Sequence, residues 1–229
     1  GCTVIMAPQP YPNAALVIQE FADAAGAPLV DVARDYRWRI VSQELRRQQV
    51  EIQTPGGKVR ARLALMGEHQ VENAATAIAC IEALREHGAL IPDESIPDGL
   101  VSVRWPRLLE VLREVPLLIA DGAHNRDSAR RLREALRDTF SAKQVAFIVG
   151  SSADKDIGGV IEELAPVAER VYAVRADHPR TMAPERIAEA FWAAGVTSEV
   201  VDNVGAAIER ALAEAESHGV ICVTGSLFV

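Results

Sequence analysis

The sequence has few cysteines and no long hydrophobic run. Its three cysteines, Cys2, Cys80 and Cys222, are far apart and lack C-x-x-C spacing, so neither a disulfide framework nor a zinc site is indicated. No apolar run approaches the roughly 20 residues that a membrane helix needs, and the first residues show no secretory leader pattern. We therefore expect no membrane association and a reducing, cytoplasmic compartment.

Clusters of positive charge are also missing from the pattern. The formal net charge is -8 and the isoelectric point is about 5.2, with basic residues dispersed along the chain. The pairs Arg46-Arg47 and Arg130-Arg131 are typical of solvated faces. This balance argues against nucleic acid or an anionic membrane as a partner. The composition, 49% hydrophobic and 24% charged, is that of a globular protein, and 229 residues allow one large or two modest domains.

The second half of the chain alternates apolar runs with polar loops. The run 117–120 leads into Asp121-Gly-Ala-His-Asn125, and the runs 145–149, 171–174 and 220–223 lead into comparable loops. Segments with helical spacing separate the runs, which predicts a mostly parallel, Rossmann-like α/β sheet whose ligands bind at its carboxyl edge. An ordinary solvated loop, with Asp121 or Asn125 as a helix cap, is the alternative for each loop. The polar side chains expected at this edge are Asp121, His124, Lys155, His178, Arg180 and Ser226.

The first half of the chain predicts a smaller α/β unit and an antiparallel hairpin. Alternation with a period of two surrounds the turn Thr54-Pro-Gly-Gly57, and a helix is expected from Gly67 to about His87. The stretch 89–99 is the predicted linker, which gives domains 1–95 and 96–229. Because a strand-like segment follows Gly1 at once, we expect a larger protein to contain this chain. The other expected elements are strands at 3–6 and 28–32 and helices at 13–24 (capped by Asn13), 127–140, 157–170, 184–194 and 204–217.

Three segments together carry a family resemblance. They are Gly67-Glu-His-Gln-Val-Glu-Asn-Ala-Ala-Thr-Ala77, Asp121-Gly-Ala-His-Asn125 and Gly150-Ser-Ser-Ala-Asp-Lys-Asp156. In order and spacing they resemble the folylpolyglutamate synthase and dihydrofolate synthase family, a branch of the Mur-type ATP-dependent amide ligases. The resemblance covers essentially the whole chain and implies the end of a central ATPase domain followed by a glutamate-ligase domain. It implies a monomer that uses ATP and Mg²⁺ to join L-glutamate to dihydropteroate or folate through an acyl phosphate.

The resemblance also implies roles for individual residues. Asn73 would contact the adenine of ATP, with His69 and Gln70 close to the nucleotide, unless Asn73 is only a local cap. Asp121 would hydrogen-bond the ribose hydroxyls, as a carboxylate at a strand end can. His124 would face the phosphates and the incoming glutamate, because an imidazole can donate to either anion.

The Gly150–Asp156 segment and a nearby arginine would complete the site. Lys155, one of three lysines in the chain, would join Asp121 and His124 as a catalytic residue through a charge network with Asp154 and Asp156. A surface ion pair is the alternative for Lys155. The glutamate substrate would be bound by His124, Ser151, Ser152 and Arg180.

One segment departs from the family pattern. The family usually has Trp-Pro-Gly-Arg-Leu-Glu where this chain has Trp105-Pro-Arg-Leu-Leu-Glu110. Leu108 stands in the place of the arginine that reaches ATP, and Arg107 stands in the place of the glycine. Arg107 would therefore bind the nucleotide only if the loop is rebuilt.

The phosphate-binding loop of the family is absent. Pro55-Gly-Gly-Lys58 lacks the first glycine, the spacing and the following Ser or Thr of a G-x-x-G-K-[ST] loop. The magnesium ligands are expected in a missing N-terminal part, with no metal site in this chain, so we expect these 229 residues to be inactive alone. The alternatives are another Mur-type ligase acting on muramyl peptides, or a non-catalytic module that binds a nucleotide or an amino acid.

Overall fold

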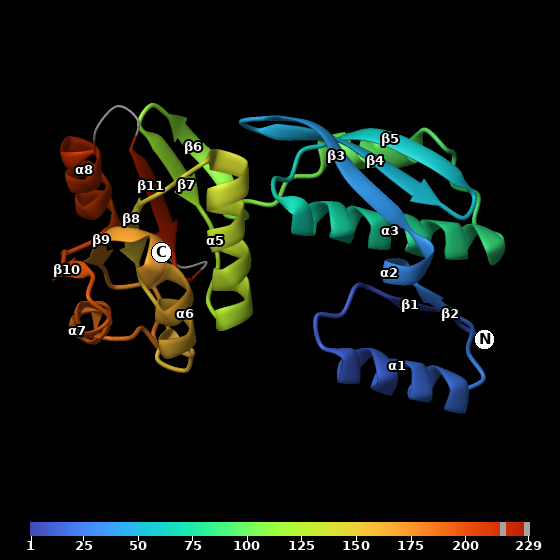
Figure 1. The fold of residues 1–229 in the computed structure, drawn as a ribbon, viewed down its shortest axis with the longest axis horizontal. Helices are drawn as coiled ribbons and strands as arrows, with labels where there is room; N and C mark the ends of the chain where they lie inside the picture. The colour runs from blue at the N-terminus through green and yellow to red at the C-terminus, as the bar shows by residue number, and fades with distance from the viewer. Residues whose placement is uncertain (216–218, 227–229) are drawn as a thin grey trace. The chain divides into compact units, whose positions relative to one another are not determined.

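The computed structural model describes residues 1–215 and 219–226. The chain folds into two compact units, Gly1–Arg104 (unit 1) and Trp105–Val229 (unit 2), which are described separately (Figure 1). The division lies after Arg104 rather than after residue 95, because helix α4 (Ser95–Ser102) occupies the predicted linker and packs into unit 1. Ile96 of this helix is only 6% exposed.

Unit 1 contains a pair of parallel strands and a three-stranded antiparallel sheet in the order β3-β4-β5. The parallel pair is β1 (Val4–Met6) and β2 (Leu29–Asp31), connected by α1 (Pro12–Ala24). The antiparallel strands are β3 (Arg37–Glu44), β4 (Arg47–Thr54) and β5 (Gly57–Leu63), with α2 (Val32–Asp35) before them and α3 (Glu68–Glu86) after them.

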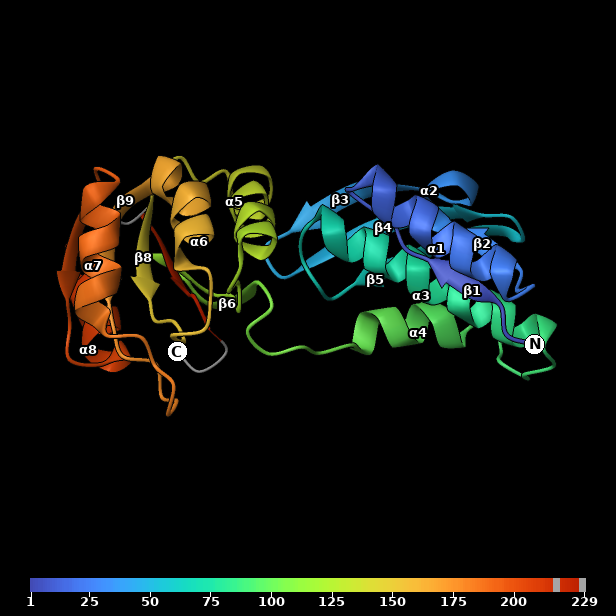
Figure 2. The ribbon, with the colours of Figure 1, turned by 90° about the horizontal axis from the view of Figure 1, so that it is seen from below.

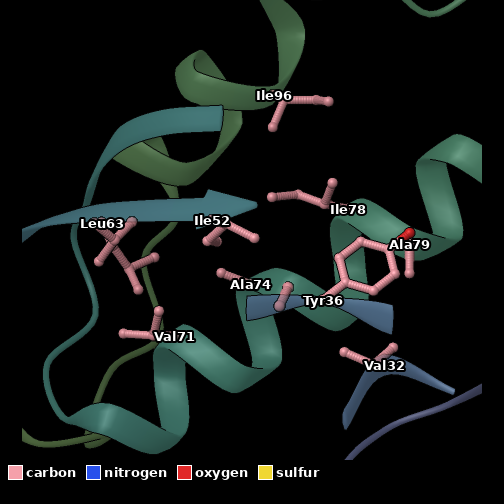
Figure 3. Close-up of a cluster of buried hydrophobic side chains, with 11 residues drawn as sticks. Val32, Tyr36, Ile52, Leu63, Val71, Ala74, Ile78, Ala79 and Ile96 are labelled. Atoms are coloured by element: carbon pink, nitrogen blue, oxygen red, sulfur yellow. The ribbon is translucent and has the colours of Figure 1, made fainter. Parts of the chain in front are cut away.

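Helix α3 forms the core of unit 1 by packing against one face of this sheet. Val71, Ala74 and Ile78 recur at helical spacing on its buried side, and β4 contributes Val50 and Ile52, which lie two apart and so share one face of the sheet. Figure 3 shows Ile52 and Leu63 of the sheet pointing toward these helix residues. Burying a side chain such as Ile52 completely contributes about 1.5–3 kcal/mol to stability.

The structure confirms the hairpin and the long helix of unit 1 and corrects one cap. Thr54 pairs with Gly57 around the predicted turn, and a third strand, β3, completes the sheet. Helix α1 begins at Pro12, and the N-cap is Tyr11, which makes no side-chain capping bond. The predicted cap at Asn13 is therefore wrong, because Pro12 already occupies the first turn, where its missing N–H costs nothing.

Unit 2 is built on a six-stranded sheet in the order β10-β9-β8-β11-β7-β6. All neighbouring strands are parallel except β6 and β7, so the predicted mostly parallel α/β sheet is confirmed. The strands are β6 (Glu110–Glu114), β7 (Leu117–Ala120), β8 (Val145–Val149), β9 (Ala168–Ala173), β10 (Thr197–Val200) and β11 (Val220–Thr224). The helices are α5 (Arg126–Phe140), α6 (Ile157–Leu164), α7 (Pro184–Ala193) and α8 (Val204–Glu214), with a short 3-10 helix η1 (Ala165–Val167).

Both faces of the unit 2 sheet are apolar. One face packs Ile148, Tyr172 and Ile221 against Ala207 and Ala211 of α8. Alternate residues of the same strands point to the opposite face, where α5 and α6 lie side by side (Figures 1 and 2). Burial on both faces is why these strands are nearly continuous apolar runs.

In unit 2 one predicted helix is too long, one strand was not predicted, and one predicted helix end falls outside the described residues. The helix expected at 157–170 ends at Leu164, because Pro166 cannot continue it, and Arg170 lies in β9. Strand β10 was not predicted, since its sequence Thr-Ser-Glu-Val is mostly polar and it lies at the sheet edge. Helix α8 ends at Glu214, and Ser217, the predicted end, lies outside the described residues.

Candidate functional site

The loops that follow β7, β11, β8 and β9 leave the same edge of the unit 2 sheet, because these neighbouring strands are parallel. Backbone hydrogen bonds join the loops just beyond the strands: Gly150 N–H donates to the Thr224 carbonyl (3.2 Å) and Gly225 N–H to the Ala123 carbonyl (2.9 Å). At Gly225 (φ +99°) a Cβ would lie 2.4 Å from the Gly150 carbonyl oxygen, so only glycine fits there. The sheet therefore brings the predicted polar loops together at one edge.

Asp121 is the central acidic group of this edge. Its Oδ1 accepts from the Ala123 N–H and its Oδ2 from the Leu109 N–H, both at 2.9 Å. Burial raises the pKa of Asp121 to about 6, and the two N–H donors and His124 oppose the rise only in part. The carboxylate thus ties two loops together and changes its charge near neutral pH.

His124 is held in one orientation beside Asp121. Its Nδ1 lies 2.8 Å from the Gly122 carbonyl oxygen, and because a carbonyl only accepts, Nδ1 must carry the proton. In the neutral ring Nε2 is then an acceptor, and in the charged ring it is a second donor. The backbone N–H of His124 donates to Ser128 Oγ (3.0 Å), so both the ring and the main chain are fixed.

Asn125 is a helix cap, as the alternative interpretation proposed. Its Oδ1 accepts from the Ser128 N–H (2.9 Å), and Ser128 Oγ accepts in return from the Asn125 N–H (3.1 Å). This capping box starts α5 directly after His124. Asp121 makes no such cap, since its two acceptor bonds go to the flanking loops.

The loop 105–109 has an unusual backbone. Arg107 (φ 61°) and Leu109 (φ 51°) lie in the left-handed region that favours glycine, at a cost of roughly 1–2 kcal/mol each. The Arg107 N–H donates to the Glu110 carboxylate (2.9 Å), while Leu109, 3% exposed, donates to Asp121. The backbone at Arg107 therefore has a conformation that favours glycine, and the arginine side chain projects from this backbone.

The loops after β8 and β9 pair with each other. Ser151 and Ser152 are buried, the Ser151 carbonyl accepts from the Met182 N–H (2.7 Å), and Ser152 forms a bridge with Thr181. Ser151 Oγ donates to the Ser152 carbonyl (3.4 Å). Both serines thus help to shape this loop, and their contact with glutamate stays a prediction.

The predicted charge network around Lys155 does not form. Asp154 Oδ2 lies 3.8 Å from Arg180, and Asp156 caps α6 by accepting from the Gly159 N–H (3.1 Å). Within residues 1–215 and 219–226, the exposed Lys155 has no ion pair, and Arg180 is likewise exposed. Both acidic neighbours of Lys155 therefore interact with other groups.

The candidate adenine residues begin α3 in unit 1. Asn73 is exposed and its Nδ2 donates to Oε1 of the buried Gln70 (3.2 Å), whereas His69 is half-buried. The N-cap is Gly67, with φ 95° and no side-chain capping bond. Asn73 therefore caps no helix end, since it lies in the second turn of α3.

Gln48 of β4 holds the start of α3 and escaped the sequence analysis. It is 1% exposed, and its Nε2 donates to the carbonyls of Leu65 (2.8 Å) and Gly67 (3.0 Å). Its Oε1 is buried without a hydrogen-bond partner in the described part of the chain, yet the two carbonyls prevent a flip of the amide. The available signal was a polar residue at a buried position of the alternating strand.

The sequence of unit 2 matches a known protein family. Residues 107–227 match the family described as Mur ligase, glutamate ligase domain, which is more than half of the chain. The chain belongs to the Mur ligase family. Its glutamate ligase domain coincides with unit 2 and therefore carries Asp121 and His124.

Individual relatives agree with this assignment. The chain is 31% identical to the dihydrofolate synthase/folylpolyglutamate synthase of Bacillus subtilis (strain 168), over 73% of this chain and 39% of that protein. It is similar in structure to Mycobacterium tuberculosis folylpolyglutamate synthase complexed with ADP and AMPPCP, with a TM-score of 0.84 and 26% identity over 97% of this chain and 52% of that one. The bifunctional Yersinia pestis enzyme complexed with AMPPNP and Mn ion gives a TM-score of 0.74 and 28% identity over 92% and 48%. The predicted family is thus confirmed, and the chain spans about half the length of these solved relatives.

The described residues contain neither a metal-binding cluster nor a membrane-spanning helix. Residues 1–215 and 219–226 contain no group of three or more His, Cys, Asp or Glu side chains placed to hold a metal ion. Over the same ranges, no helix is long and apolar enough to cross a bilayer.

Proposed function

We propose that this chain is the C-terminal part of an ATP-dependent ligase that adds L-glutamate to dihydropteroate or folate. The observation that carries the proposal is the Asp121-to-Asn125 loop, in which a half-buried carboxylate and an oriented imidazole stand at the carboxyl edge of a glutamate ligase domain. The relatives named above, which are folylpolyglutamate and dihydrofolate synthases, support the choice of substrates.

Each candidate residue has a role that its chemistry supports. Asn73, with His69 and Gln70, would contact adenine, because an exposed amide offers both a donor and an acceptor to the base edge. Asp121 would accept from the ribose hydroxyls with the lone pairs that its two backbone bonds leave free. In its charged form the His124 ring would donate from Nε2 to the phosphate or to the glutamate carboxylate, and Arg107 and Arg180 would add positive charge.

The proposed reaction has two steps. A carboxylate oxygen of the pteroate or folate attacks the γ-phosphorus of ATP, the bond to the ADP oxygen breaks, and an acyl phosphate forms. The glutamate amine then attacks the acyl carbon, phosphate departs with the electrons of the C–O bond, and the amine loses a proton. The residues of this chain would act by positioning and by neutralising charge, which are the main sources of acceleration in phosphoryl transfer.

Magnesium fits the chemistry of the family but not the residues of this chain. Because the described residues offer no cluster of three ligands, we derive no step through the ion. We propose that its ligands and the phosphate-binding loop belong to the part of the relatives that this chain does not span, and that the 229 residues are catalytically incomplete. A monomer in the cytoplasm, with Cys2, Cys80 and Cys222 as free thiols, is the proposed state.

Glutamate ligation by the intact protein tests the proposal. Asp121→Ala and His124→Ala should each lower kcat/KM for glutamate addition to dihydropteroate by about a hundredfold or more, since each removes a positioning contact. Asp138→Ala, which changes an exposed carboxylate of α5 paired with Arg137, is the matched control and should leave the rate unchanged. Normal ligation by both site variants would overturn the proposal, and ligation to a muramyl nucleotide instead of pteroate would favour the other Mur-type ligases.

A further inference from the structure

The outer face of the β3-β4-β5 sheet is strongly basic in an otherwise acidic chain. Residues 37–63 carry seven Lys or Arg and two Glu, whereas the whole chain has a net charge of -8. Basic residues are dispersed along the sequence, but the antiparallel pairing places most of these side chains on the sheet face that α3 does not cover. We call this surface the basic face.

Strand register arranges the basic face in rows that cross the sheet. Arg39 pairs with Glu51 and Glu51 with Arg60, so these three form one row. The neighbouring rows contain Lys58, opposite Gln53, and Arg62, opposite Gln49. Because same-face residues are two apart along a strand, successive rows are about 6.7 Å apart. Positive groups therefore repeat along the face at a regular interval.

Glu51 shows how this face binds a carboxylate. Its oxygens accept from Arg60 Nε (2.9 Å), Lys58 Nζ (3.1 Å) and Arg39 Nη2 (3.1 Å). The hydrogen bonds from Arg60 and Lys58 lower the pKa of Glu51 to about 2. One carboxylate thus holds three cationic side chains in place, and two of their charges remain uncompensated.

A groove runs along the same face. It has a volume of about 600 Å³, and its charged lining consists of Arg39, Arg60, Arg62, Glu44, Glu51 and Asp98. Within the described residues Arg62, which lines the groove, and Arg47, which lies on β4 beside it, are exposed and have no ion pair. These two guanidinium groups are available to an added anion, while Glu44 and Asp98 limit where it can lie.

We propose that the basic face binds an oligo-γ-glutamate chain through its free carboxylates. In such a chain five backbone bonds separate one carboxylate from the next, which is about 6 Å when extended, close to the spacing of the rows. Arginine binds carboxylates in a bidentate fashion, as Arg47 and Arg62 are free to do. Among the residues that the structure describes, the groove lining includes no aromatic side chain on which nucleic acid bases would stack. The choice of this ligand rests on the proposed function, whose product carries glutamate residues.

Binding to the purified 229-residue protein tests this inference without any catalysis. Titration calorimetry with tetra-γ-glutamate should detect binding at low salt, and the dissociation constant should rise steeply as salt is added. The double variant Arg47→Gln/Arg62→Gln should weaken binding at least about tenfold, because two charge-assisted contacts are lost. The control Arg137→Gln/Arg186→Gln removes the same charge from exposed positions in unit 2 and should bind normally.

Three results would overturn the inference. They are no detectable binding at low salt, binding that the Arg47/Arg62 double variant leaves unchanged, and equally tight binding of single-stranded RNA or anionic vesicles that the same variant abolishes. The assay reports on one sheet face of unit 1, whereas the ligation test reports on Asp121 and His124. A negative result in the binding assay therefore does not contradict the proposed ligation, and a negative result in the ligation assay does not contradict binding at the basic face.

Discussion

Two polar side chains hold the candidate loops, one in each unit, and they do so with opposite chemistry. Gln48 in unit 1 is a neutral amide that donates to the carbonyls of Leu65 and Gly67. Asp121 in unit 2 is a carboxylate that accepts from the N–H groups of Leu109 and Ala123. Either side chain bonds to two backbone groups of the loop it holds, but only Asp121 can change its charge. We therefore expect the unit 2 loops to respond to pH and the start of α3 not to.

The largest expected effect is the pH dependence of Asp121. Its pKa of about 6 in the folded chain exceeds the usual 3.8, so folding favours the protonated form. The stability that this group contributes is complete below pH 4 and is lost as pH rises through 6, by up to about 3 kcal/mol. The difference in unfolding free energy between wild type and Asp121→Asn should change by about that amount between pH 4 and pH 7, as measured by urea denaturation.

Asp138→Asn is the control for this titration. Its hydrogen bond to Arg137 lowers the pKa of Asp138, so its contribution is present at neutral pH and is lost as pH falls, the opposite direction. If the difference in unfolding free energy between wild type and Asp121→Asn stays constant from pH 4 to pH 7, the expected contrast between the Asp121 loop and the Gln48 loop is wrong.

Replacing the neutral Gln48 amide should lower the unfolding free energy by somewhat less than the change expected at Asp121. Gln48→Leu removes the Gln48 donor from the Leu65 carbonyl and leaves the Gly67 carbonyl with the Gln70 N–H alone, which should destabilise unit 1 by about 1–2 kcal/mol at every pH from 5 to 8. Because the start of α3 would also lose its support, ADP binding by the intact protein should weaken. Gln49→Leu, at the exposed neighbour on the same strand, is the matched control and should change neither quantity. Unchanged stability of Gln48→Leu would show that water satisfies the Leu65 carbonyl in place of Gln48.

The smallest effect concerns the strained loop that Asp121 holds. Arg107→Gly should stabilise unit 2 by up to about 1 kcal/mol, because glycine adopts a positive φ without a steric cost but loses more entropy on folding. Ser141→Gly, at the other left-handed position outside the loop (φ 54°), should give a similar gain in thermal denaturation. If Arg107 also binds the nucleotide, Arg107→Gly alone should weaken ADP binding. Equal ADP affinity in both variants would assign the strain at Arg107 no role in binding.

The candidate site was predictable to the extent that it depends on strand order along the chain. The apolar run before Asp121 ends in a loop as expected, and the parallel sheet brings that loop and the Gly150 loop to one edge. The contacts of the individual side chains were not predictable. Ser151 and Ser152 turn inward to pair with the loop after β9, and Asp154 and Asp156 find partners other than Lys155.

The sequence by itself determined the apolar runs, the turn at Thr54–Gly57, the helix periodicity and the family, because these depend on residues close together in the chain. Tertiary structure alone decided that β11 inserts between β7 and β8, that Gln48 reaches the start of α3, and that Arg107 takes a left-handed backbone. It also decided that Arg39, Glu51 and Arg60 share one row. Each of these features joins segments that are separated in sequence or fixes a backbone angle against local preference. Only the packing of the whole unit supplies the free energy that holds these long-range contacts and strained backbone angles in place.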